Sequence, residues 1–129
     1  MTSETAGAET GGHRRRLGRR GEQRAADWYA AAGYEVLARN WTCAQGELDL
    51  VARKGRTYVF CEVKTRSSEA FGSPAEAVTP IKQARIRRLA ARWLAEARAA
   101  DRAGPGARTV RFDVVAVLGE RIDVIEEAF

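Results

Sequence analysis

Three ionisable residues in the middle of the chain, Asp49, Glu62 and Lys64, have spacings that bring them together if the surrounding segments form a hairpin. The segments 46–53 and 57–66 both predict strands. A two-residue turn between them keeps the three side chains on one face of the sheet, with Asp49 opposite Glu62. A connection of odd length would place the two carboxylates on opposite faces.

This arrangement has two interpretations. Two carboxylates on neighbouring strands repel each other unless a cation lies between them, and their hard oxygen ligands suit Mg²⁺ or Mn²⁺. Lys64 beside such an ion can orient or activate a water molecule, as metal-assisted hydrolysis of a phosphodiester requires. The same residues also fit the solvated face of an ordinary hairpin, with Glu62 and Lys64 as a surface ion pair.

A third carboxylate, Glu22, lies on a predicted helix over residues 14–32, which has apolar residues at helical spacing and ends at Gly33. At about 100° per residue Glu22 falls close to the apolar face, so it needs a partner. A metal site at the hairpin would supply that partner. Pairing with Arg19 or Arg20 at the rim of the helix explains Glu22 equally well.

An Asp followed by Glu-x-Lys on consecutive strands, after a helix that carries a Glu, resembles the PD-(D/E)xK nuclease superfamily and especially the archaeal Holliday-junction resolvases. Over a longer span the chain resembles the YraN-like family of uncharacterised bacterial proteins. That resemblance extends from about residue 17 to the end. Its sequence blocks are Gly21-Glu22 to Ala25, Gly33-Tyr34, Arg39-Asn40, Gly46 to Leu50, Phe60 to Arg66, Gly72-Ser73-Pro74, Glu76-Ala77-Val78, Lys82 and Arg111 to Val115.

The resemblance implies an α/β fold of the restriction-endonuclease type, a three-layer α/β/α sandwich around a mixed central sheet. It implies that Asp49, Glu62 and the Val63 carbonyl hold Mg²⁺ or Mn²⁺, that Lys64 acts on the attacking water, and that Glu22 is an additional carboxylate. The superfamily motif usually has proline before its aspartate, where this chain has Leu48.

The net charge of +5 is unevenly distributed. Residues 1–20 carry a balance of +3 and residues 81–98 one of +5, whereas residues 119–129 carry −3. Clustered cations suit the phosphates of a nucleic acid, although they also fit the solvated faces of an arginine-rich protein. The residues expected to contact phosphates are Arg14, Arg15, Arg16, Arg19, Arg20, Lys82, Arg85, Arg88 and Arg92.

The 129 residues predict one domain over residues 14–129, preceded by a disordered tail over residues 1–13. Apolar runs of membrane-spanning length and a signal-peptide segment are both lacking, so we expect a cytoplasmic protein without a membrane partner. Cys43 and Cys61 are then expected to be reduced thiols.

Four further elements complete the expected order. Residues 34–40 predict a first strand, residues 109–118 a later strand and residues 121–125 a short edge strand. A long helix over residues 80–100 follows a shorter helical start at residues 73–76. The long helix is expected to bury Ile81, Ile86, Leu89, Ala90, Trp93 and Ala97, with Trp93 in the core rather than stacked on a base.

The sequence therefore predicts a metal-dependent nuclease, with DNA favoured over RNA and repair or recombination as its setting. The alternative is a module that binds nucleic acid without cleaving it. A purely structural or protein-interaction domain is a third option, but it leaves the inward carboxylates unexplained. The substrate structure and the oligomeric state, a dimer included, are left open.

Overall fold

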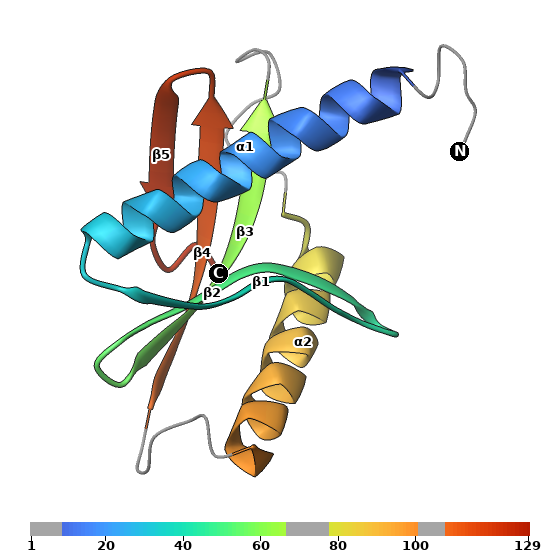
Figure 1. The fold of residues 1–129 in the computed structure, drawn as a ribbon. Coiled ribbons are helices and arrows are strands. Elements are labelled where there is room, and N and C mark those ends of the chain that lie inside the picture. Colours follow the sequence, from blue (N-terminus) through green and yellow to red (C-terminus); the bar gives the residue numbers. More distant parts are fainter. Residues whose placement is uncertain (1–8, 67–77, 101–107) are drawn as a thin grey trace.

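The computed structural model describes residues 9–66, 78–100 and 108–129, with side chains from residue 19 onward. The elements, shown in Figure 1, are α1 (Glu9–Ala31), β1 (Glu35–Cys43), β2 (Gly46–Lys54), β3 (Thr57–Arg66), α2 (Pro80–Ala99), β4 (Thr109–Leu118) and β5 (Arg121–Ile125). The expected helix start at residues 73–76 and residues 1–8 lie outside the described residues.

Helix α1 begins at Glu9 rather than near Arg14, so residues 9–13, which we expected in a disordered tail, are helical. Extending a helix beyond its packed part costs little once a turn exists, because each added residue contributes one hydrogen bond. Composition alone therefore placed the start of the helix too late.

The strands form one mixed sheet in the order β1-β2-β3-β4-β5. The β1–β2, β2–β3 and β4–β5 pairs are antiparallel, whereas β3 and β4 are parallel. Helix α2 lies in the connection between the two parallel strands, as parallel pairing requires. The expected strand over 121–125 is confirmed as β5 at the edge of the sheet.

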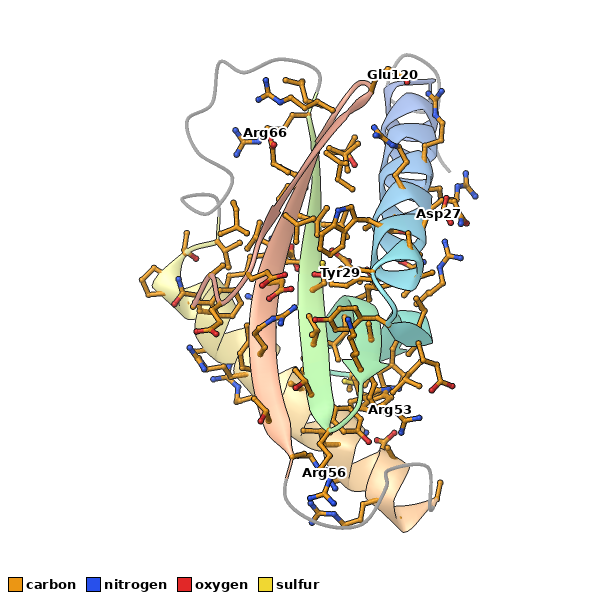
Figure 2. The ribbon with its side chains drawn as sticks, turned by 90° about the vertical axis from the view of Figure 1, so that its left-hand side faces the viewer. Asp27, Tyr29, Arg53, Arg56, Arg66 and Glu120 are labelled. Atoms are coloured by element: carbon orange, nitrogen blue, oxygen red, sulfur yellow. The ribbon has the colours of Figure 1, made fainter. Side chains whose placement is uncertain are left out.

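The two helices cover opposite faces of this sheet, which gives the expected α/β/α layers. On one face Ala25, Ala26 and Tyr29 of α1 pack against Leu50 and Val59. Figure 2 shows Tyr29 directed from α1 toward the strands and Asp27 directed away from them.

On the other face α2 packs against Phe60 and Val51 through Leu89 and Trp93. Trp93 lies edge-on to Phe60, with ring centroids 5.9 Å apart, so its expected place in the core is confirmed. Both sheet faces are therefore buried. Phe60 lies two residues before Glu62 on the same side of β3. The sheet face that carries Glu62 is therefore apolar up to Phe60 and ionisable beyond it.

The β2–β3 hairpin has the predicted register, with Lys54 paired to Thr57 and Leu50 paired to Cys61. Gly55 makes the tight turn possible because its φ of +61° is in the left-handed region. The connection has the expected even length, but the pairing ends at Leu50 and Cys61, so the predicted pair of Asp49 with Glu62 does not form as part of the ladder. The two carboxylates are instead neighbours just beyond its end.

Helix α2 begins at the Thr79-Pro80 pair, as predicted, where the Thr79 hydroxyl accepts a hydrogen bond from the Lys82 amide at 3.2 Å. Five of the six expected core residues of α2 are buried: Ile86, Leu89, Ala90, Trp93 and Ala97. Ile81 is wrong, because its side chain is 74% exposed. It lies in the first turn, ahead of the part of the helix that packs on the sheet.

Both cysteines are free thiols, as expected, with Cys61 buried and Cys43 partly buried. Neither helix in the described ranges combines the length and the apolar character needed to cross a membrane.

Candidate active site between β2 and β3

The site residues surround a point where β2 and β3 separate. The ladder of paired residues between these strands ends at Leu50 and Cys61, so the backbone of β3 beyond Cys61 needs another partner on this side. The Asp49 carboxylate supplies it by accepting a hydrogen bond from the Val63 amide at 2.9 Å. The side chain of Asp49 is thereby held in the gap between the two strands.

This position makes Asp49 unusually basic for an aspartate. Burial raises its pKa to about 7, and repulsion from the Glu62 carboxylate acts in the same direction. The Val63 amide lowers the pKa, but only in part. A carboxyl group in this state is stabilised either by a proton or by a cation beside it.

Glu62 already has cationic neighbours. Its side chain is 11% exposed and forms ion pairs with Lys82 of α2 at 2.9 Å and with Lys64 of β3 at 3.4 Å. Lys64 follows Glu62 by two residues on the same strand, and Lys82 lies in the first turns of the helix that covers this face. The site is therefore a cluster of two carboxylates and two ammonium groups.

The pKa of Lys64 is lowered, whereas that of Lys82 is raised. Burial lowers the pKa of Lys64, and the nearby Lys82 ammonium lowers it further, while Glu62 acts in the opposite direction. A lysine with a lowered pKa loses its proton more readily, as a group that activates a water molecule must.

Glu22 lies at the edge of this cluster rather than within it. The Glu22 side chain forms a hydrogen bond with Asn40, and the charge of Glu22 raises the pKa of Asp49. Burial raises the pKa of Glu22, and Glu47 raises it too, whereas Asn40, Arg39 and Arg19 lower it. Glu22 therefore interacts electrostatically with both Asp49 and Arg19.

The donor set fits a divalent cation in part. Asp49 and Glu62 supply carboxylate oxygens, and the Val63 carbonyl faces the same gap, because the N–H and C=O of one strand residue point to the same neighbour. Oxygen donors of this kind suit Mg²⁺ or Mn²⁺. Glu22 lies at the edge of this donor set, where its charge acts on Asp49.

The expected phosphate-binding residues fall into separate groups. Arg19 and Arg20 are exposed on α1, and the side chains of Arg14, Arg15 and Arg16 lie outside the described residues. Lys82, which was expected to contact phosphates, forms an ion pair with Glu62 and belongs to the central cluster. The register of β2 and β3 could not show this, because Lys82 comes from the covering helix.

Arg85, Arg88 and Arg92 do lie together, as expected for a surface that binds phosphates. With Gln45 and Leu89 they line a depression of about 390 Å³ beside the β1–β2 turn. Arg92 also pairs with Glu96 at 3.0 Å and donates a hydrogen bond to Gln45. The depression therefore has one side on α2 and the other on the hairpin.

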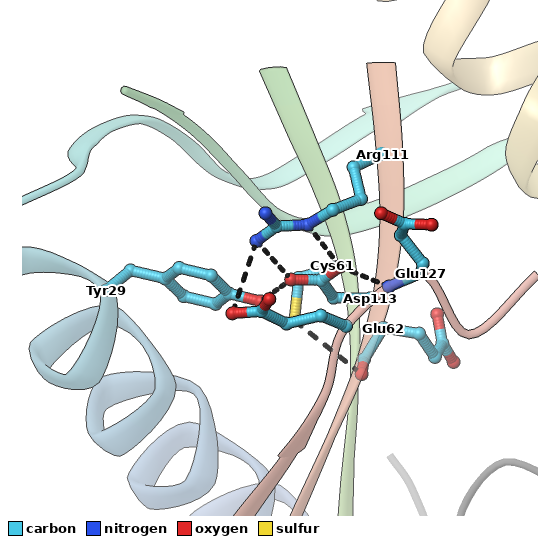
Figure 3. A network of polar contacts seen from close by, with 7 residues as sticks. Tyr29, Cys61, Glu62, Arg111, Asp113 and Glu127 are labelled. Atoms are coloured by element: carbon cyan, nitrogen blue, oxygen red, sulfur yellow. Dashed lines mark hydrogen bonds and ion pairs between the residues drawn. The ribbon is translucent and has the colours of Figure 1, made fainter. Parts of the chain in front are cut away.

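Sequence reasoning missed a second polar group, which is buried on the α1 face (Figure 3). Asp113 of β4 is fully buried and accepts hydrogen bonds from the Tyr29 hydroxyl at 2.6 Å and from the Glu127 amide at 3.1 Å. Arg111 bonds both of its oxygens, each at 2.9 Å. The available signal was Arg111 and Asp113 at alternate positions of an otherwise apolar strand.

Comparison with known proteins assigns the chain to a family. The model of uncharacterised protein family UPF0102 matches residues 21–117. A UPF0102 protein of Beutenbergia cavernae is 62% identical over 105 residues, which cover 81% of this chain and 84% of the relative.

Two further relatives agree over comparable or longer spans. A UPF0102 protein of Acidothermus cellulolyticus is 49% identical over 132 residues and covers 95% of this chain and 99% of its own length. One from Nocardia farcinica is 52% identical over 118 residues, with 92% and 87% covered. The resemblance to the YraN-like proteins is thereby confirmed, and the chain belongs to the uncharacterised protein family UPF0102.

Proposed function

We propose that this protein is a metal-dependent nuclease that hydrolyses phosphodiester bonds of nucleic acid, with DNA favoured. The observation that carries the proposal is the buried Asp49 carboxylate, held by the Val63 amide beside Glu62 and Lys64. Carboxylates that repel each other in a partly buried gap, with a lysine of lowered pKa next to them, are typical of a site that binds a cation.

In this proposal Asp49, Glu62 and the Val63 carbonyl hold Mg²⁺ or Mn²⁺. The ion would supply a Lewis acid for the phosphate oxygens. Lys64 orients or deprotonates the attacking water, and Glu22 acts from the edge of the site on the charge of Asp49. The arginines of α2 bind backbone phosphates, which positions the strand without reading its sequence.

A second candidate is a module that binds nucleic acid without cleaving it. It is favoured by the ion pairs that Glu62 already forms with Lys82 and Lys64, because these two ammonium groups neutralise the carboxylates without a metal ion. The two candidates differ in whether a divalent cation displaces Lys82 from Glu62.

Cleavage assays decide between them. Labelled linear, flapped and four-way DNA and RNA are incubated with the protein in Mg²⁺, Mn²⁺ or EDTA. For a nuclease, Asp49→Asn, Glu62→Gln and Lys64→Ala should each reduce metal-dependent cleavage by at least about 100-fold, and double variants should lose little more. Glu47→Gln is the matched control, because Glu47 is exposed and has no assigned role.

Metal binding has a readout that does not depend on turnover. Millimolar Mn²⁺ or Mg²⁺ should raise the thermal midpoint of the wild type, because the ion binds the folded site, and Asp49→Asn should abolish the rise. A wild type that binds nucleic acid, cleaves none of the substrates and is unmoved by metal would establish the binding module instead.

A further inference from the structure

Beside the basic depression lies a second hollow of different chemistry, with a volume of about 370 Å³. We refer to it as the apolar slot. It is lined by Leu37, Ala38 and Trp41 of β1 and by Trp93, Glu96 and Ala97 of α2. Trp41 and Leu37 are only partly buried against the core, so part of their apolar surface faces this hollow.

The slot and the basic depression share one wall. Arg92 lines the depression, Glu96 lines the slot, and the two side chains form an ion pair at 3.0 Å one turn apart on α2. Gln45 and Trp41 lie on the β1–β2 hairpin, which in Figure 1 extends toward α2. A molecule that binds along α2 therefore meets the cationic surface first and the apolar surface next.

The distribution of charge determines which part of a strand suits each hollow. Arg85 and Arg88 in the depression attract phosphates. Glu96 at the slot repels phosphates but not an uncharged aromatic ring. A nucleotide strand has both chemistries at a fixed spacing, with an anionic backbone and bases that stack on indole rings.

We propose that the apolar slot takes one unpaired base of a nucleic-acid strand, which stacks on Trp41 while the flanking phosphates lie in the basic depression. The proposal rests on the nucleic-acid binding in the proposed function and narrows its substrate to a strand with single-stranded character. In a duplex each base is stacked and paired, so it would have to leave the helix to enter the slot.

The geometry also relates the slot to the candidate active site. Lys82 contacts Glu62, and Glu96 lies fourteen residues further along the same helix, which corresponds to about 21 Å at 1.5 Å per residue. Arg85, Arg88 and Arg92 occupy the interval. The bound base is therefore separated from the cleavage position by a few nucleotides of extended strand.

The test compares oligothymidylate with an abasic oligonucleotide of equal length and charge, both fluorescently labelled, in EDTA so that no cleavage occurs. The wild type should bind oligothymidylate at least about fivefold more tightly, which corresponds to one stacked base. Trp41→Leu, which keeps an apolar side chain but has no aromatic ring, should abolish this preference. Trp41→Phe should retain it, and binding of the abasic strand should stay the same in both variants.

Leu94→Ala controls for destabilisation, since Leu94 packs on the same core but lines neither hollow. Annealing oligothymidylate to oligodeoxyadenylate should weaken binding. The same comparison is made with RNA, between oligouridylate and an abasic RNA strand of equal length. A preference for the strand with bases supports the slot in either case, and its relative size in DNA and RNA shows which nucleic acid the slot favours.

Equal wild-type affinities for oligothymidylate and the abasic strand, or a preference that survives Trp41→Leu, would overturn the proposal. So would a change in elution volume on Trp41→Leu without a change in binding, which would make the slot a contact between two copies. If the protein cleaves nucleic acid but binds strands with and without bases equally, the slot proposal is wrong and the nuclease proposal stands. If the protein prefers strands with bases but cleaves none of the substrates, the slot proposal is supported and the nuclease proposal is wrong.

Discussion

The surroundings of Asp49 favour its protonated form. Burial and the Glu62 charge raise its pKa from 3.8 to about 7. A group whose pKa is higher in the folded state contributes stability that is fully present below the unfolded pKa and is lost as the pH rises through the folded pKa. The protein is therefore expected to lose stability between about pH 4 and about pH 7 on account of this residue.

Asp49→Asn should remove that loss. Without metal, the variant should be more stable than the wild type at about pH 8, by at most about 4 kcal/mol, and nearly equal to it at about pH 4. The asparagine oxygen can still accept the Val63 hydrogen bond. Urea unfolding at both pH values measures the difference, with Glu120→Gln, an exposed carboxylate between β4 and β5, as control. A gain of equal size at both pH values would contradict a raised pKa.

The buried Asp113 carboxylate accepts four hydrogen bonds, which come from Tyr29, Arg111 and Glu127. Tyr29→Phe leaves one carboxylate oxygen with fewer donors and should cost about 1–3 kcal/mol. Asp113→Ala removes the carboxylate that accepts two hydrogen bonds from the Arg111 guanidinium, and it should lower the free energy of unfolding by about 3–5 kcal/mol. Thermal unfolding tests the order. Nearly neutral substitutions would show that the network does not hold α1 and the C-terminal segment to β4.

At the scale of elements, local rules predicted most of the fold. The even turn at Gly55 and the alternation of β2 and β3 predicted Asp49 close to Glu62, and the Glu62 charge does act on Asp49, although the strand pairing itself ends at Leu50 and Cys61. They could not show that Lys82 reaches Glu62, since that contact depends on how α2 packs over the sheet. The prediction that Ile81 is buried was wrong for a related reason. Helical periodicity identifies the apolar face of a helix but not how far along the helix the sheet extends.

The packing of α1 on β3 depends on Gly21. A Cβ at this position would overlap Thr65 Oγ1, and the buried Thr65 hydroxyl has no hydrogen-bond partner among the residues that the structure describes. Gly21→Ala should therefore destabilise the protein by about 1–2 kcal/mol, because the overlap outweighs the better helix propensity of alanine.

The double variant Gly21→Ala, Thr65→Ala identifies the cause. Removing Oγ1 leaves Thr65 Cβ as the nearest atom, at 3.4 Å, so the alanine at position 21 then fits and should stabilise the helix. Thr65→Ala alone should be nearly neutral, since the Thr65 hydroxyl has no hydrogen-bond partner within residues 9–66, 78–100 and 108–129. Denaturant unfolding of the four proteins gives the coupling energy. Additive effects would mean that α1 does not lie this close to β3.

At the scale of the whole molecule, opposite charges gather at different edges of the sheet. The acidic residues 119–129 include β5 at one edge, whereas the depression lined by Arg85, Arg88 and Arg92 adjoins the hairpin of β1 and β2 at the other. This separation orients an approaching polyanion toward the side that also holds the candidate active site. The interpretation of the helix cations as merely solvated residues predicts no such preference.

Neutralising part of this basic surface separates the two interpretations. Arg85→Gln with Arg88→Gln should weaken the binding of any nucleic-acid sequence and lower the slope of log affinity against log salt by about 1.4 for a single strand. Arg56→Gln with Arg98→Gln removes the same charge from exposed positions outside the depression and should change the slope little. Anisotropy titrations in EDTA over a range of salt measure both. If the two pairs lowered affinity and slope equally, net charge rather than the α2 depression would govern binding, and the path of the strand along α2 would be wrong.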